Sequence, residues 1–174
     1  LSGQFFLAQR MVALPGALIS RPISQVFFQT MVQKNKNGEE TMPFLLTTIK
    51  KLVLIMFPIV VAVIIASPFL FKIIFGDEWV FSGTIAQYLA VVVFIRFVVS
   101  TISPVFSITG YLKRGAIWKY VYFISTGLMF FSGFLFSMDI ESFLIIFVAH
   151  EYVLYLIYLY LIIKSTKQMD LKVK

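Results

Sequence analysis

Three arginines, Arg10, Arg21 and Arg96, lie within long apolar stretches of the sequence. A charged side chain is costly in hydrocarbon, so such residues usually face the interior of a helical bundle or a water-filled cavity. The planar guanidinium group donates two parallel hydrogen bonds to one phosphate, which suits arginine to anionic headgroups. The three residues therefore predict a hydrated, net-positive cavity inside a membrane, with an anionic headgroup as its ligand.

The spacing of these arginines indicates which faces of the helices are polar. Arg10 and Arg21 are eleven residues apart, close to three turns of about 3.6 residues each. They are expected to share one helix face with Gln25, unless Pro15 and Pro22 shift the phase. Polar side chains recur at helical spacing in two later runs, at Arg96, Ser100, Ser103 and Ser107 and at Glu151, Tyr155 and Tyr158.

Glu151 leaves two interpretations open. It is an acidic group within an apolar run, so it pairs with Arg21 or Arg96 to hold helices together, or it serves in ion coupling. One carboxylate does not neutralise two arginines, which favours the cavity for Arg21 and Arg96. Arg10 lies near the outer end of its run, where it either reaches the interface or joins the headgroup site. His150 is either a packed, hydrogen-bonded residue or a proton relay.

Five apolar runs must position these groups, at residues 5–32, 52–71, 82–109, 120–138 and 143–163. Each is close to or longer than the roughly 20 residues that cross about 30 Å of hydrocarbon as a helix. Hydrophobic residues make up 60% of the chain and charged residues 13%, against about 25% charged in a soluble domain. We therefore predict an all-α integral membrane protein with about five transmembrane helices in a single domain, residues 1–174.

Basic and acidic loops alternate between these runs. Lysine and arginine cluster in three places, the residues flanking the loop at 33–40, the turn at 110–119 and the tail at 164–174. The turn at 75–79 holds Asp77 and Glu78, and the turn at 137–142 holds Asp139 and Glu141. Positive charge near helix ends stays cytoplasmic, which predicts a cytoplasmic C-terminus. The net charge of +7 therefore suits anionic membrane lipids as partners and not nucleic acid.

Two tryptophans and two glycines predict further features of the helices. Trp79 and Trp118 are expected in the aromatic belts at the two membrane interfaces. Gly127 and Gly133 mark positions where helix backbones are expected to approach closely.

Enzymatic chemistry is not indicated. There is no cysteine and one histidine, and no nucleophile–base pair, metal-ligand spacing or Gly-rich phosphate loop is present. We expect no catalytic residue, metal or cofactor, and the remaining class is a secondary transporter or facilitated flippase. The sequence begins LSGQFFLAQR without an initiator methionine, which suggests one part of a longer transporter.

Three segments are similar to the C-terminal half of bacterial polysaccharide flippases, the O-antigen and capsule translocases of the multidrug/oligosaccharidyl-lipid/polysaccharide exporter superfamily. They are LAQRMVALPGALISRPISQVFF at 7–28, PFLFKIIFGDEW at 68–79 and SPVFSITGYLKRG at 103–115. The resemblance implies two six-helix lobes related by a pseudo-twofold axis, of which this chain would supply most of the second. It also implies a sugar repeat unit on undecaprenyl pyrophosphate as substrate, in the bacterial cytoplasmic membrane.

The expected function is thus translocation of this lipid-linked oligosaccharide by alternating access, for polysaccharide biosynthesis. Pro15, Pro22, Pro58 and Pro104 are candidate bending points. The expected partners are the lipid-linked sugar, membrane lipids, an N-terminal lobe of the same protein, and polymerase and ligase machinery. A multidrug or cation exporter of the same superfamily and a non-transporting membrane scaffold are the alternatives.

Overall fold

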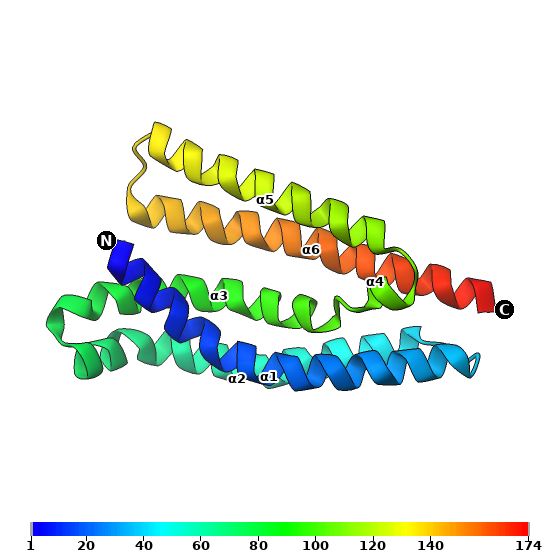
Figure 1. Ribbon diagram of the computed structural model, residues 1–174. Coiled ribbons are helices and arrows are strands. Elements are labelled where there is room, and N and C mark those ends of the chain that lie inside the picture. Colours follow the sequence, from blue (N-terminus) through cyan, green and yellow to red (C-terminus); the bar gives the residue numbers. More distant parts are fainter. Residues whose placement is uncertain (1, 174) are drawn as a thin grey trace.

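The fold consists of five long helices and two short ones, and the predicted all-α class is confirmed. A computed structural model describes residues 2–173, and no strand occurs among them. The elements are α1 (Ser2–Lys36), α2 (Met42–Phe75), the 3-10 turn η1 (Asp77–Trp79), α3 (Val80–Ile102), α4 (Val105–Ile108), α5 (Leu112–Leu135) and α6 (Ile140–Val173). Figure 1 shows the long helices lying lengthwise across the view and reversing direction from one to the next, with the N-terminal part of α1 inclined to the others.

Four stretches are long and apolar enough to cross a membrane, Gly3–Lys36, Met42–Phe75, Asp77–Ile108 and Ile140–Leu171. The chain is therefore a multi-pass membrane protein. α5 is not among the four, because Lys113, Arg114 and Lys119 lie in its first eight residues and shorten its apolar part. The crossing at residues 120–138 stays a prediction.

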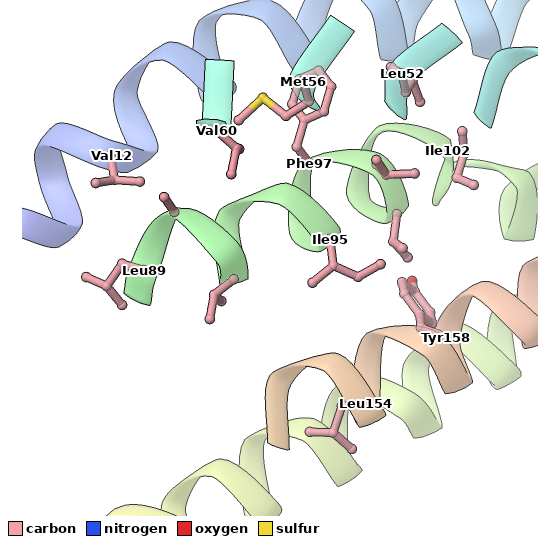
Figure 2. Packing of buried hydrophobic residues seen from close by; sticks show 14 of the residues in the cluster. Val12, Leu52, Met56, Val60, Leu89, Ile95, Phe97, Ile102, Leu154 and Tyr158 are labelled. Atoms are coloured by element: carbon pink, nitrogen blue, oxygen red, sulfur yellow. The ribbon is translucent and has the colours of Figure 1, made fainter. Parts of the chain in front are cut away.

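α3 is the central helix of the fold. It packs against α1 and α2 on one side and against α6 on the other, and it supplies many of the buried apolar side chains. In Figure 2, Phe97 of α3 points toward Met56 of α2, while Ile95 lies on the side of Leu154 and Tyr158 of α6. A binding site between α3 and its neighbours would therefore have α3 as one of its walls.

Pro68 sits at the closest approach of α2 and α3. Proline lacks an N–H group, which leaves the carbonyl of Ile64, four residues earlier, without its helical partner. The side-chain amide of Gln87 on α3 donates to this carbonyl at 2.6 Å, and Ser67 Oγ donates to the carbonyl of Gly83 at 3.0 Å. Neighbouring polar groups therefore satisfy the backbone that the proline leaves open.

Two helix boundaries differ from the sequence prediction. The third apolar run, predicted at 82–109, is interrupted: α3 ends at Ile102, a turn over Ser103 and Pro104 follows, and α4 begins at Val105. Pro104 cannot continue the hydrogen-bonded ladder, so the polar stripe predicted from Arg96 onward is broken after Ser100. The predicted basic turn at 110–119 is shorter, because helix α5 already begins at Leu112.

The glycines singled out for close packing do not bring two backbones together. A Cβ added at Gly127 would meet no atom within 4 Å, and one at Gly133 would lie 2.8 Å from the ring of Phe143. The tightest backbone approach is at Gly83, where an added Cβ would lie 2.5 Å from the Cα atom of Pro68.

The basic segments gather at one end of the bundle. Figure 1 places the loop after α1, α4 and the C-terminal end of α6 together, opposite the N-terminus and the other two turns. The carboxylate of Asp170 on α6 accepts hydrogen bonds from Thr41 N at 3.0 Å, Thr41 Oγ1 at 2.6 Å and Met42 N at 2.9 Å. The basic tail continues as helix α6 to Val173, and Lys174 lies outside the described residues.

We expect replacement of Asp170 by alanine to loosen this end of the bundle. The carboxylate satisfies two backbone N–H groups at the start of α2, where the helix dipole also favours negative charge. Their loss should cost about 1–2 kcal/mol of stability and speed amide hydrogen exchange at Thr41 and Met42. Asp77→Ala at the opposite end removes only an exposed ion pair with Lys72 and serves as the control. Equal exchange in both variants would contradict the capping role.

Asp139 caps the start of α6 in a similar way. The backbone amide of Ser142 donates to Asp139 Oδ2 at 2.9 Å, and this bond holds the pKa of Asp139 below its ordinary value. Both ends of α6 are therefore anchored by acidic side chains, one capping its own first turn and one capping α2.

Candidate functional site

The packing of α1 against α3 leaves a first cavity of about 210 Å³ near the middle of both helices. The α1 side chains in this wall are small, so α1 and α3 approach each other closely and an unfilled space remains over the small side chains. The lining residues are Ala13, Gly16, Ala17 and Ser20 of α1 and Val93, Arg96, Phe97 and Ser100 of α3. Arg96 is the charged group in this wall.

A second, larger cavity of about 700 Å³ follows toward the basic end of the bundle. It lies where α3 ends at Ile102 and the chain turns at Pro104. The lining residues are Arg21, Ser24, Gln25, Phe28, Gln29 and Pro104. Ser20 and Arg21 are adjacent, so the two cavities adjoin along α1. We call them together the α1–α3 groove.

Arg96 is held by two residues from the opposite side of α3. Its Nε donates to Glu151 Oε2 at 2.8 Å, and its Nη2 lies 2.7 Å from the same oxygen. Nη2 also donates to the hydroxyl of Tyr122 at 2.7 Å, and that hydroxyl donates to Glu151 Oε1 at 3.0 Å. The Tyr155 ring lies 5.9 Å from the guanidinium carbon. The Arg96–Tyr122–Glu151 cluster thus joins α3, α5 and α6.

The contacts of Glu151 correspond to the ion-pair interpretation, and a role in ion coupling stays a prediction. The Glu151 side chain is 0% exposed and that of Arg96 is 30% exposed, so the carboxylate is the buried partner and the guanidinium still borders the groove. A buried ion pair compensates its own charges. Arg96 therefore contributes hydrogen-bond donors to the groove but little net positive charge.

Arg21 carries the uncompensated charge of the groove. It is exposed and forms none of the ion pairs among residues 2–173. Gln25 lies one turn further along the same cavity wall, as the spacing predicts. Arg10 is also exposed but lines neither cavity of the groove. The structure therefore brings Arg21, Gln25 and Arg96 to one groove and leaves Arg10 outside it.

His150 lies away from the groove, between α5 and α6. Its Nε2 is 3.2 Å from Ser125 Oγ, and its Nδ1 is buried without a hydrogen-bond partner in the described structure. This placement corresponds to the packed, hydrogen-bonded interpretation. In residues 2–173 no group of three His, Cys, Asp or Glu side chains is arranged to hold a metal ion.

Trp118 is a packing residue, and its depth relative to the membrane interface stays a prediction. Its ring is 7% exposed, stacks on Tyr158 at 3.9 Å between centroids, and donates from Nε1 to the carbonyl of Leu154 at 2.9 Å. Trp118 and Tyr122 are four residues apart on α5, opposite the Glu151, Tyr155 and Tyr158 stripe. That matched spacing is the signal by which Tyr122 could have been found from the sequence.

The chain is thus a multi-pass helical membrane protein with a polar groove that is lined by two arginines. Residues 2–84 match the model of a family described as "Polysaccharide biosynthesis protein". The matched segment is just under half of the 174 residues and includes Arg21 but not Arg96. It associates this part of the chain with polysaccharide biosynthesis at a general level. Comparisons with curated proteins and with solved structures found no match.

Proposed function

We propose that the chain forms the C-terminal part of a flippase that moves undecaprenyl-pyrophosphate-linked oligosaccharide repeat units across the bacterial cytoplasmic membrane. The observation that carries the proposal is the α1–α3 groove, where Arg21 and Arg96 border cavities of about 700 and 210 Å³. The family match over residues 2–84 supports the same direction, because this segment contains the α1 wall of the groove.

The groove suits the two parts of such a headgroup. The unpaired Arg21 attracts the diphosphate and donates paired hydrogen bonds to it. Ser24, Gln25 and Gln29 on the same wall offer donors and acceptors for sugar hydroxyls. Arg96 lies deeper along the groove, oriented by its bonds to Glu151. The prenyl chain stays in lipid throughout.

Transport then requires that the groove face each side of the membrane in turn. An N-terminal lobe of the same protein would supply the opposite wall, and rocking of the two lobes would alternate the access. A binding site drives such a change only if its affinity differs between the two states. Arg21 lies next to Pro22, which is inside α1, so bending of the helix at this proline would move the guanidinium.

A multidrug or cation exporter receives less support. Such a protein needs an acidic group free to bind a cationic drug or a proton, and both oxygens of Glu151 already accept hydrogen bonds from Arg96 and Tyr122. A non-transporting scaffold has no need for an exposed, unpaired Arg21 inside an apolar helix.

The proposal is tested in the parent protein, deleted in its own host. Lipid-linked oligosaccharide in the inner leaflet should accumulate, and the wild-type gene should clear it. Arg21→Gln should clear it at least about tenfold more slowly, because a hydrogen bond to a charged group contributes about 1.5–3 kcal/mol. Arg10→Gln, an arginine of the same helix outside the groove, is the control at matched membrane level.

Two results would count against the proposal. Equal rescue by the Arg21 and Arg10 variants would remove the groove from the mechanism. A deletion strain that accumulates no lipid-linked sugar but becomes sensitive to cationic drugs would assign the protein to the multidrug branch.

A further inference from the structure

A second groove lies on another face of α1, between α1 and α2. It has a volume of about 390 Å³, and its walls are apolar, with Pro22 and Val26 on α1 and Phe44 and Ile55 on α2. One cationic residue, Lys51, is part of the lining. We call it the α1–α2 groove.

The groove exists because α1 and α2 each pack mainly against α3 and only weakly against each other. Near the loop that joins them they touch through Phe27 and Phe44, whose rings stack at 5.8 Å between centroids. Val26 and Ile55 remain 63% and 43% exposed beside this contact. The groove is therefore open to whatever surrounds the helices, which in a membrane is lipid.

The depth of Lys51 in the membrane follows from the sequence of α2. Residues 52–71 carry no charge, and twenty helical residues cross about 30 Å of hydrocarbon. Lys51 directly precedes them, so its ammonium group lies where lipid phosphates lie. On α2 the groove extends from Phe44, two turns before Lys51, to Ile55, one turn into the hydrocarbon. Lys51 takes part in none of the ion pairs of residues 2–173.

We propose that the α1–α2 groove binds a glycerophospholipid with an anionic headgroup, one acyl chain lying between Val26 and Ile55 and the phosphate contacting Lys51 Nζ. Charge complementarity selects an anionic headgroup, since a lone lysine at this level attracts negative lipid. The volume of about 390 Å³ accommodates one acyl chain. The residues that line this groove differ from those that line the α1–α3 groove. Lipid binding here does not rest on the proposed transport function, whereas its consequence for Arg21 does.

Bound lipid would act on α1 itself. A ligand that binds only the folded protein stabilises it, and the stabilisation grows with the logarithm of the ratio of ligand concentration to Kd. Because Pro22 lines the lipid site and Arg21 lines the α1–α3 groove, a lipid here fixes the part of α1 that carries the substrate-facing arginine.

The test uses the purified full-length protein, with bound lipid counted by native mass spectrometry. Phosphatidylglycerol and phosphatidylcholine with identical acyl chains are the probes. Wild-type protein should retain phosphatidylglycerol preferentially, and Lys51→Gln should weaken this binding roughly fivefold. Lys50→Gln is the matched control, because Lys50 is exposed at the same level but does not line the groove. Val26→Trp, which fills the groove, should reduce binding of both lipids.

Several outcomes would overturn the proposal. Equal weakening by the Lys50 and Lys51 variants would mean diffuse attraction to the basic surface. Unchanged binding in Val26→Trp would mean that no chain enters the groove. Preferential retention of a polyprenyl phosphate over phosphatidylglycerol would assign the groove to the substrate lipid instead.

Discussion

Replacing Glu151 by alanine is expected to destabilise the folded protein by about 3 kcal/mol, since removal of one partner leaves the other charge uncompensated. The carboxylate is 0% exposed, and it is the counter-ion of Arg96 at 2.7 Å. Without it the guanidinium loses its counter-ion and keeps the hydroxyl of Tyr122 and the Tyr155 ring as neighbours. For a chain of this size the loss corresponds to a fall in Tm of about 6–12 °C.

A double-mutant cycle separates the ion pair from general packing. Arg96→Met alone should also destabilise, because Glu151 then remains as a buried charge. The combined Arg96→Met/Glu151→Leu variant should recover most of the lost stability, since an apolar pair of similar volume often replaces a buried ion pair without cost. Thermal unfolding of the purified variants in one detergent measures all four corners of the cycle.

The same cycle tests whether Arg96 has a role beyond folding. If the double variant regains stability but not clearance of lipid-linked sugar, the donors of Arg96 at the α1–α3 groove contribute to transport. If the single variants are as stable as wild type, the Arg96–Tyr122–Glu151 cluster does not hold α3, α5 and α6 together, and the structural argument fails.

The long helices follow from the sequence because their cause is local. Uncharged runs such as residues 52–71 must be helical in a membrane, since every backbone group has to be satisfied within the segment. The helices extend past these runs, as at Ser2–Lys36, because polar residues at the ends remain good helix formers outside the hydrocarbon. Pro104 ended the third run earlier than its hydropathy suggested, and α5 ends at Leu135, three residues before the predicted end of the fourth run.

The partner of Glu151 does not follow from the sequence. Periodicity places Glu151, Arg21 and Arg96 on faces of their own helices, but it carries no information on which helices adjoin. That choice depends on packing: α3 lies against α6, so Arg96 reaches Glu151. Sequence periodicity likewise gives no indication that Asp170, 129 residues from Thr41, caps α2, because this contact also depends on which helices adjoin.

Close backbone contacts were also beyond the sequence analysis. Gly83, Gly127 and Gly133 look alike in an apolar helix, and the pattern favoured the two on α5. The contact at Gly83 depends on Pro68, fifteen residues earlier on the facing helix, which leaves the carbonyl of Ile64 without its helical partner. The hydrogen bonds from Gln87 to Ile64 O and from Ser67 Oγ to Gly83 O need the helices to approach this closely.

Replacing Gly83 by alanine is therefore expected to be among the most damaging single changes in the protein, at about 3 kcal/mol. The added Cβ would lie 2.5 Å from Pro68 Cα and 2.8 Å from the carbonyl oxygen of Ser67. These are backbone atoms, which cannot rotate away as a side chain does, so α2 and α3 must move apart. Separation would also stretch the bond from Gln87 to Ile64 and leave that carbonyl unpaired.

Gly127→Ala provides the matched control for this prediction. An added Cβ there meets no atom within 4 Å, and alanine favours a helix over glycine by about 0.5–1 kcal/mol. The two substitutions are chemically identical, so their opposite effects on thermal unfolding and on the amount of protein in the membrane isolate the α2–α3 contact. Similar behaviour of the two variants would mean that α2 and α3 do not meet at Gly83, and the groove walls built on α3 would have to be placed anew.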